Sequence, residues 1–245
     1  MKKVTILTSL YNAEQYLQGF LENITQQTVF SQCELYLLNG NSPENEEDII
    51  LPYLKEYNNI RYQRLDFDPG IYGCWNYMIK NSNSKYITNA NVDDKLFPKC
   101  IEKHLDLLEN DDTIDVAYCA NYVSDSEKTD HNDINRILSV PNSSMHIFPT
   151  AEYSYDLLRQ ANLPHNHPVW RRSLHDRFGY FEEMEYVSGS DWEFWLRCGS
   201  KGAKMELIKE VLGIYFKNPK GVSTKEENME RNLKEVFEIR KKYAN

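Results

Sequence analysis

Several carboxylate and amide side chains stand just after short apolar runs or at a helix start, where the structure has little obvious need for them. Asp68 follows one short apolar run, and Asn91, Asp93 and Asp94 follow another. Asp191 stands at the beginning of a helix-like stretch further along the chain. Carboxylate oxygens bind hard divalent cations, and a carboxylate can also act as a general base. Asn and Asp also cap helices and form turns, but we do not expect this to be the main role of the adjacent pair Asp93 and Asp94.

Polar residues at three helix starts have the spacing of caps. Asn12 and Ser42 each precede a helical stretch, and capping is the expected first role of both. Ser190 and Glu193 form a capping box in which Ser190 caps the helix and Glu193 reaches back to it. Asp191 then lies in the first turn, where the positive end of the helix dipole favours the ionised carboxylate.

Short apolar runs alternate with stretches of helical period through the first half of the chain. Strands are expected at 4–8, 33–38, 60–65, 86–90 and 116–122, with helices between them. Strict alternation implies parallel strands joined by right-handed crossovers. The expected fold class is therefore α/β, with a Rossmann-like, doubly wound and mostly parallel sheet that carries helices on both faces. Ligands bind at the carboxyl ends of the strands in such a sheet, which is where the acidic residues fall.

The alternation loosens after Tyr122. The later elements are expected to be a mobile surface loop over 124–135, a helix over 150–163, a rigid turn over 164–168, short strands over 205–208 and 211–215, and a terminal helix within 224–245. The terminal helix is charged and carries only a thin apolar stripe, so we expect it to pack on the domain or on a partner.

Charge and hydropathy exclude several classes of protein. The net charge of -9 and the pI near 5.2 argue against a nucleic-acid groove, which needs a basic surface. No apolar run approaches the roughly 18 residues of a membrane span, and the chain starts with a strand rather than a signal peptide. We expect a cytoplasmic protein, or one peripheral to the inner face of the membrane. The five cysteines are scattered, which suggests free, buried thiols rather than a zinc or redox centre.

Five segments resemble motifs of the family 2 glycosyltransferases, in that family's order and approximate spacing. They are the opening strand 4–12 with its Tyr-Asn ending, the D-x-G-I-Y stretch at 68–72 with Asn76, the DXD position at 91–94, the acidic helix start at 190–191, and the loop 220–224. The resemblance implies an inverting, bacterial polysaccharide-type sugar transferase with a GT-A domain over residues 1–224. Residues 225–245 are then a C-terminal amphipathic helix or the start of a linker.

The resemblance also implies roles for individual residues. Asp191 is implied as the catalytic base, and Asp93 as the ligand of Mn²⁺ or Mg²⁺. The residues implied in nucleotide binding are Thr8, Tyr11, Asn39, Asp68, Asn76, Asn91 and Val92. The residues implied in donor or acceptor contacts are Asp94, His165, Trp170, Ser190 and Ser223. The family usually has Asp where this chain has Asn39 and Asn91. Uracil recognition would then use the amide carbonyl of Asn39 together with Asp68. With Asn91 in place of Asp, the metal would have one carboxylate ligand fewer.

The implied reaction moves a hexose or N-acetylhexosamine from a nucleotide diphosphate, UDP in the first place, to a hydroxyl of a saccharide or lipid-linked saccharide. The sequence does not decide whether the protein forms a homo-oligomer or whether a further C-terminal domain follows. Two alternative functions also stay open. A sugar-phosphate nucleotidyltransferase would need a glycine-rich loop after the first strand, and residues 8–12 contain no glycine. A catalytically degenerate nucleotide- or glycan-binding domain is suggested by Asn39 and Asn91, although such a domain has no need of Asp191.

Overall fold

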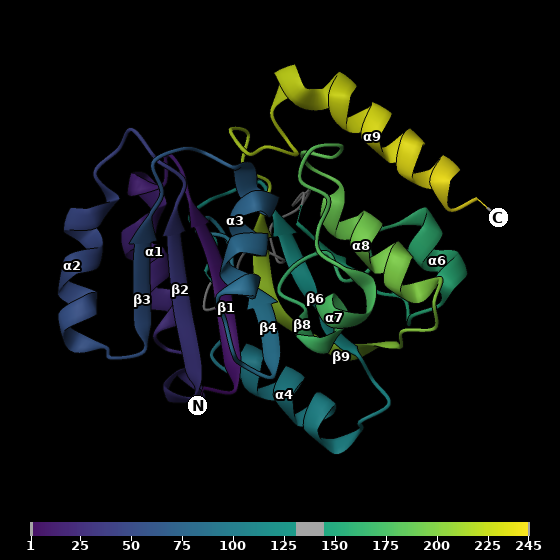
Figure 1. Cartoon of the computed structure of the whole chain (residues 1–245), viewed down its shortest axis with the longest axis horizontal. Coiled ribbons are helices and arrows are strands. Elements are labelled where there is room, and N and C mark those ends of the chain that lie inside the picture. Colours follow the sequence, from purple (N-terminus) through teal and green to yellow (C-terminus); the bar gives the residue numbers. More distant parts are fainter. Residues whose placement is uncertain (1, 131–144, 245) are drawn as a thin grey trace.

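One large sheet organises the chain (Figure 1). The computed structural model describes residues 2–130 and 145–244. Within these residues the sheet has nine strands, of which eight follow the order β3-β2-β1-β4-β8-β6-β9-β5, and β7 pairs with β6. The strands are β1 Val4–Leu10, β2 Cys33–Asn39, β3 Ile60–Arg64, β4 Tyr86–Asn89, β5 Lys95–Leu96, β6 Val116–Ser124, β7 His146–Phe148, β8 Val169–Arg171 and β9 Met205–Phe216. The α-helices are α1 Glu14–Ile24, α2 Glu46–Glu56, α3 Gly70–Lys80, α4 Cys100–Asn110, α6 Tyr155–Gln160, α7 Ser173–Phe178, α8 Ser190–Gly199 and α9 Met229–Lys242.

The strands of the first half are parallel neighbours, as the alternation of strands and helices predicts. β3, β2, β1 and β4 pair in parallel, and β6 pairs in parallel with β9. β8 interrupts this pattern because it is antiparallel to both β4 and β6, and the short β5 is antiparallel to β9. Most paired residues nevertheless lie in parallel ladders. The mixed, mostly parallel sheet with helices on both faces confirms the expected fold class.

Apolar side chains are buried on both faces of the sheet. On β1, Ile6 packs in a core with α1, α2 and α4, whereas Leu7 packs in a second core with α3 and α8. Successive side chains of a strand point to opposite faces, so a strand covered on both sides is a continuous apolar run. Figure 1 shows α3 in front of the strands and α1 behind them.

Two elements differ from the sequence-based expectation. Residues 205–208 and 211–215 form the single strand β9, which accommodates the polar residues between them at register shifts against β6. The helix expected over 150–163 is only α6, because Ser154 caps it by accepting the N–H of Leu157 and the backbone is extended again at Ala161. Part of the loop expected over 124–135 lies outside the described residues, which stop at 130 and resume at 145.

Asn12 and Ser42 do not cap the helices that follow them. Asn12 has a φ of 51°, and Ala13 holds the cap position of α1. The N–H of Asn12 donates to the Ser42 hydroxyl at 3.0 Å, and this hydroxyl donates to Glu46 at 2.6 Å. Asn45 holds the cap position of α2. The two residues therefore connect the loops after β1 and β2, which the sequence pattern did not predict.

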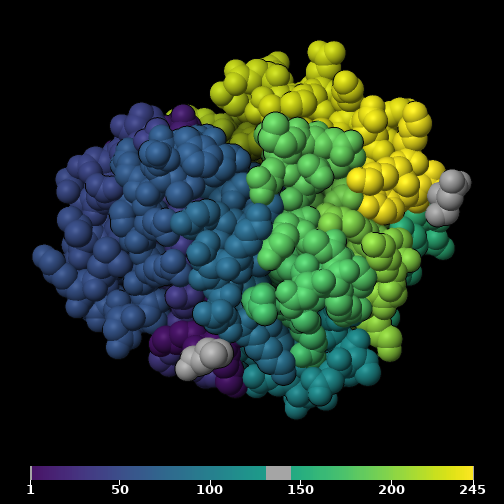
Figure 2. All heavy atoms as spheres, in the orientation of Figure 1, coloured from purple at the N-terminus to yellow at the C-terminus, as the bar shows by residue number. Residues whose placement is uncertain are grey.

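The C-terminal segment folds as α9 and packs on the domain, as expected. Figures 1 and 2 show it across the outer side of the segment that contains α8. Its buried residues are Glu235 and Ile239. Of the expected apolar stripe, Val236 and Tyr243 pack, partly buried, against the core that contains Ile239. Met229, Leu233 and Phe237 are 55%, 65% and 66% exposed, so only part of the stripe faces the domain. No helix in the described part of the chain is long and apolar enough to cross a membrane.

Candidate active site

The loops after β4 and β9 meet around Asp94 at the carboxyl ends of these strands. The buried Asp94 carboxylate accepts the N–H of Phe216 at 3.0 Å, the Asn91 amide at 3.0 Å and the Asn166 amide at 3.3 Å. Burial, followed by the neighbouring Asp93, raises the pKa of Asp94 well above its usual value. With three protein donors on its two oxygens, Asp94 orders the loop.

Asn91 and Val92 also serve this loop. The Asn91 amide points toward the Asp94 carboxylate, and its backbone carbonyl accepts the N–H of Asp94 at 3.3 Å. An amide fits this position because a carboxylate would face another carboxylate. The Val92 side chain packs, half-buried, against the core on the α1 side. Both side chains are half-buried and already engaged within the protein, Asn91 with Asp94 and Val92 with the core.

Asp93 is the carboxylate of this loop that best fits a cation. Its Oδ2 accepts the Asn218 amide at 2.8 Å, and Asn218 follows directly after β9. Burial is the largest cause that raises the pKa of Asp93; Asn218 opposes the shift and Glu127 adds to it. No cationic side chain of the described residues takes part. A half-buried carboxylate with a neutral donor and an acidic neighbour is a suitable ligand for a divalent cation.

Asp191 lies in the first turn of α8 with a neutral donor at each oxygen. The Tyr72 hydroxyl is 3.0 Å from Oδ1, and the Asn162 amide donates to Oδ2 at 2.7 Å. Burial raises the pKa of Asp191, and the bonds from Asn162 and Tyr72 oppose this effect. A carboxylate that is oriented by neutral donors and has a raised pKa is suited to act as a general base.

The start of α8 is not the predicted capping box. Gly189 holds the cap position, and the buried Ser190 hydroxyl has no hydrogen-bond partner among the described residues. Glu193 contacts Arg197 at 2.8 Å and accepts the Tyr243 hydroxyl at 2.5 Å. The prediction failed because partners from the C-terminal segment compete with the cap for Glu193. Ser190 is completely buried, so its hydroxyl, next to the candidate base, is closed to a ligand in this arrangement, and the expected donor or acceptor contact is not supported.

Tyr215, near the end of β9, is affected by the charges of Asp93 and Asp94 and by that of Asp191. Burial is the main cause that raises the pKa of Tyr215 to about 12, and Asp94, Asp93 and Asp191 all add to the shift. The Ser223 hydroxyl opposes it. Carboxylates from segments far apart in the sequence therefore share one electrostatic environment, and the loop that contains Ser223 borders it.

The loop that leads into α8 is held by α9. Glu235 accepts the N–H groups of Val187, Ser188 and Gly189 at 2.9, 2.9 and 3.0 Å, and the Ser188 hydroxyl at 2.9 Å. The approach is close, since a Cβ added to Gly189 would lie 2.7 Å from Ile239 Cδ1. A buried carboxylate that gathers several backbone N–H groups fixes a loop firmly. The C-terminal helix is thus part of the scaffold of the site.

Two residues expected at the nucleotide lie in open positions. Tyr11 is 51% exposed at the end of β1, and Asp68 is exposed at the entry to α3. Asp68 Oδ1 accepts the N–H of Gly70 at 2.8 Å. The same oxygen would lie 3.0 Å from a Cβ added to Gly40, so the loops after β2 and β3 are in contact.

Thr8, Asn39 and Asn76 are instead buried and engaged within the protein. The Thr8 hydroxyl donates to a backbone carbonyl at the end of β4 at 2.9 Å. The Asn39 carbonyl oxygen accepts the N–H of Ser42 at 2.8 Å, and the Asn76 amide exchanges hydrogen bonds with the backbone of Phe181. A contact between a base and the Asn39 side chain would therefore compete with Ser42.

His165 lies near the site, whereas Trp170 does not. The His165 and Tyr215 rings meet edge to face with centroids 4.7 Å apart, and burial lowers the pKa of His165 to about 4. Trp170 is completely buried, and its Nε1 donates to His175 at 2.9 Å. The expectation that Trp170 offers a stacking surface to a sugar is wrong, because β8 is an inner strand and its side chains belong to the core.

The sequence reasoning missed Tyr72, Asn162, Asn218, Tyr215 and Glu235. Tyr72 belongs to the D-x-G-I-Y stretch, and Asn218 comes just before the motif at 220–224, so both could have been chosen as candidates. No local pattern marks Asn162 or Glu235, because each reaches the site only through tertiary contacts.

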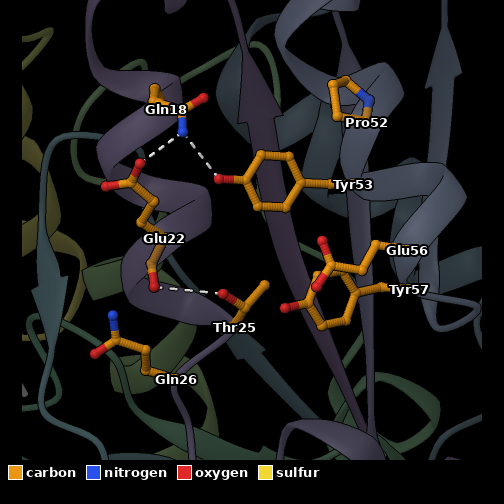
Figure 3. A pocket seen from close by; sticks show the side chains of 8 residues that line it. All are labelled: Gln18, Glu22, Thr25, Gln26, Pro52, Tyr53, Glu56 and Tyr57. Carbon is orange, nitrogen blue, oxygen red and sulfur yellow. Dashed lines mark hydrogen bonds between the residues drawn. The ribbon is translucent and has the colours of Figure 1, made fainter.

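A shallow depression between α1 and α2 contains none of these residues (Figure 3). It is lined by Gln18, Glu22, Thr25, Gln26, Pro52, Tyr53, Glu56 and Tyr57. The Gln18 amide donates to Glu22 and to the Tyr53 hydroxyl at 2.6 and 3.0 Å. These polar side chains satisfy one another, and we assign no ligand to this surface.

Sequence comparison finds relatives among sugar transferases. The family model described as glycosyl transferase family 2 matches residues 5–178. An uncharacterised glycosyltransferase of Methanocaldococcus jannaschii is 24% identical over 213 residues, which are 86% of this chain and 70% of the relative. The minor teichoic acid biosynthesis protein of Bacillus subtilis is 30% identical over 151 residues, which are 58% of this chain but only 17% of that protein.

Solved structures share the fold at low sequence identity. TarS 1–349 of S. aureus in complex with UDP-GlcNAc has a TM-score of 0.69 and 15% identity, over 89% of this chain and 59% of that chain. The mannosyltransferase PcManGT from Pyrobaculum calidifontis, in complex with GDP-Man and Mn2+, has a TM-score of 0.71 and 12% identity, over 99% of this chain and 64% of that chain. The sheet, the carboxylates at its edge and the family match over most of the chain lead to one conclusion: this protein is a transferase that belongs to glycosyl transferase family 2 and has the GT-A fold.

Proposed function

We propose that this chain is an inverting glycosyltransferase that moves a sugar from a nucleoside diphosphate, UDP in the first place, to a hydroxyl of a saccharide or lipid-linked saccharide. The observation that carries the proposal is a pair of carboxylates that neutral side chains orient. The Tyr72 hydroxyl and the Asn162 amide lie 3.0 and 2.7 Å from the two oxygens of Asp191, and the Asn218 amide donates to Asp93 at 2.8 Å. Transfer needs a carboxylate for a cation and a second one for a proton, close to one another. The UDP-GlcNAc in the TarS structure supports a UDP-sugar, and GDP-mannose is the competing donor.

A divalent cation, Mn²⁺ or Mg²⁺, is proposed to bind at Asp93. When bound, the cation stabilises the negative charge that develops on the leaving diphosphate. Asn218 orients the Asp93 carboxylate, and Asp94 keeps the loop in shape through its three hydrogen bonds. The Mn2+ in the mannosyltransferase structure supports this choice of ion.

Asp191 is proposed to accept the proton of the acceptor hydroxyl. Tyr72 and Asn162 fix the plane of its carboxylate, and burial raises its pKa toward the range in which a base works well near neutral pH. Attack by the acceptor oxygen on the face opposite the diphosphate is a single displacement, which inverts the anomeric carbon. Glu235 acts as a positioning residue, because it holds the loop that precedes Asp191.

The remaining open residues are proposed to hold the donor and the acceptor. Tyr11 and Asp68, at the ends of β1 and β3, are the proposed nucleoside contacts. Ser223 is proposed to contact the diphosphate. The neutral imidazole of His165 is proposed to contact the sugar or the acceptor.

Release of nucleoside diphosphate tests the proposal. The full chain is incubated with UDP-GlcNAc, UDP-glucose, UDP-galactose or GDP-mannose, with and without Mn²⁺, and with a mixture of saccharide and lipid-linked saccharide acceptors. We expect release from a UDP-sugar that requires the metal and increases with the acceptor. Asp93→Ala should abolish the release. Asp106→Ala removes an exposed carboxylate of α4 and serves as the matched control.

Two outcomes would replace the proposal. Binding of a nucleotide sugar without release of the diphosphate from any donor would favour a degenerate binding domain. Formation of pyrophosphate from a nucleoside triphosphate and a sugar phosphate would favour a nucleotidyltransferase.

A further inference from the structure

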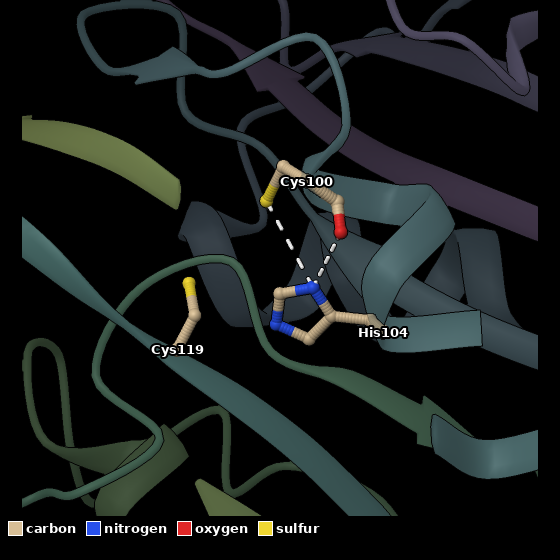
Figure 4. A group of neighbouring side chains, drawn as sticks. All are labelled: Cys100, His104 and Cys119. Carbon is tan, nitrogen blue, oxygen red and sulfur yellow. Dashed lines mark hydrogen bonds between the residues drawn. The ribbon is translucent and has the colours of Figure 1, made fainter. Parts of the chain in front are cut away.

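A second cluster of ligand-type side chains lies inside the protein, apart from the carboxylates. Cys100 and His104 are one turn apart on α4, and Cys119 faces them from β6 (Figure 4). All three are buried, and one candidate ligand atom from each lies within 4.8 Å of the others. The linear spacing gives no hint of this cluster, because the sheet brings Cys119 to a helix that is distant in the sequence.

The His104 ring is held in the manner of a metal ligand. Its Nδ1 is 2.7 Å from the backbone carbonyl of Cys100, so this nitrogen carries the proton and donates it. The opposite nitrogen, Nε2, is buried and has no hydrogen-bond partner among the described residues. A histidine that binds a metal typically donates its other N–H to a carbonyl or carboxylate in this way. Figure 4 shows the Nε2 edge of the ring turned toward the side on which Cys119 lies.

A second buried histidine, His167, lies in the same region. His167 has at most the backbone of Asn89 as a hydrogen-bond partner among the described residues, so at least one of its ring nitrogens is unpaired. Several unsatisfied nitrogens in one dry region are costly unless something binds them.

We propose that Cys100 Sγ, His104 Nε2 and Cys119 Sγ form a structural site for Zn²⁺, with a water molecule in the fourth position. Thiolate and imidazole ligands select zinc over the hard cations that suit Asp93. Binding releases the two thiol protons, and two thiolates then balance the charge of the dication, so the buried complex is neutral. The ion would fasten α4 to β6.

Cobalt absorption and zinc content test this site in the full chain, purified with a reductant that does not bind metals. The wild type should retain one equivalent of zinc, lose thermal stability on removal of the ion by a chelator, and regain it with zinc alone. Co²⁺ added to the metal-free protein should produce the strong thiolate-to-cobalt charge-transfer band. Cys119→Ala should lose the zinc and the band. Cys33→Ala is the matched control, because Cys33 is an equally buried free cysteine of the same core.

The active-site carboxylates provide a second control. Asp93→Ala should leave the zinc content and the cobalt band unchanged, which separates this site from the catalytic cation. The wild type alone decides the matter even if Cys119→Ala does not fold. A wild type that retains no zinc and gives no charge-transfer band with Co²⁺ would overturn the proposal, as would a band that persists in folded Cys119→Ala.

Discussion

Glu235 belongs to the outer helix α9, yet its hydrogen bonds predict that its substitution slows catalysis. The carboxylate accepts three backbone N–H groups and one hydroxyl from residues 187–189. In Glu235→Gln, the amide oxygen can take the place of Oε2, which accepts three of these bonds, but the NH₂ group then faces the N–H of Val187, so at least one bond is lost. Bonds to a charged group contribute about 1.5 to 3 kcal/mol each, so the smallest expected cost is roughly 1.5 to 3 kcal/mol.

We expect much of this cost to appear as movement of the loop. Val187 is 40% exposed, so the released N–H groups can turn toward water. Stability should then fall by only about 1 to 3 kcal/mol, while Asp191 moves away from the acceptor. Displacement of a catalytic group by about 1 Å costs roughly 10²-fold in rate. We therefore expect turnover to fall by about 10- to 100-fold, with little change in donor affinity.

The assay compares turnover at saturating donor, donor affinity and melting temperature on the same preparations. Glu238→Gln is the matched control, because Glu238 is an exposed carboxylate of the same helix. The reasoning is refuted if Glu235→Gln turns over as fast as Glu238→Gln. It is also refuted if Glu235→Gln loses donor affinity and turnover in equal measure, because that result places the loop at the donor instead of at the base.

Four further predictions follow from the contacts of the site. UDP should raise the melting temperature only when Mn²⁺ or Mg²⁺ is present, and Asp93→Ala should remove this shift; equal binding without metal would contradict the role of Asp93. Asn91→Asp should lower stability by about 1 to 3 kcal/mol, because it replaces the donor to Asp94 by a second carboxylate; tighter Mn²⁺ binding at full stability would show that position 91 faces the metal. Glu193 also contacts Lys242 at 3.1 Å, and the Lys242 side chain is 44% exposed, so this ion pair is only half-buried. Glu193→Gln should therefore destabilise the protein by about 2 to 3 kcal/mol, less than the loss of one partner of a completely buried pair; a melting temperature equal to that of the wild type would contradict this. Since burial raises the pKa of Asp191, turnover should be lost as the pH falls through a value above the usual range of aspartate, and an acid limb at the ordinary value would argue against this base.

The pattern of the sequence predicts the parallel half of the sheet because each of its strands is buried on both faces. In the apolar run of β1, Ile6 packs in one core and Leu7 in the other. The helix that follows, α1, has its apolar residues at a clear helical spacing. The ends of these strands then identify Asp68 and Asp93 from geometry alone. The antiparallel strand β8 could not be predicted in this way, because its three residues give no periodicity and a turn precedes it.

The errors at the site have a common physical cause. Ser190 and Glu193 satisfy a local rule, but Arg197 and Tyr243 provide stronger partners for Glu193 than a helix end does. Trp170 was selected for its neighbourhood in the sequence, whereas an inner strand carries it into the core. A local sequence pattern shows only which neighbours in the sequence can contact a side chain. The partners and the burial of these side chains depend on residues that the fold brings together.

The expectation of free, buried cysteines is confirmed, but the sequence did not show which of them lie together. Cys100 and Cys119 are free and buried, as predicted, yet their scattered positions concealed that the fold brings both thiols to His104. Metal sites built from a helix and a strand of a sheet need no short spacing between their ligands, so the absence of a paired motif is weak evidence against them.

Transfer by Asp191→Asn, measured in a single turnover together with donor binding, tests the central claim most directly. Asparagine keeps the size of the side chain, and its amide can still form hydrogen bonds with Tyr72 and Asn162, so the fold and the donor site should persist. The account predicts unchanged affinity for the nucleotide sugar and transfer lowered by about 10²- to 10⁴-fold, the usual contribution of a general base. Transfer at a nearly normal rate by this variant, with the donor bound as in the wild type, would show that Asp191 is not the base.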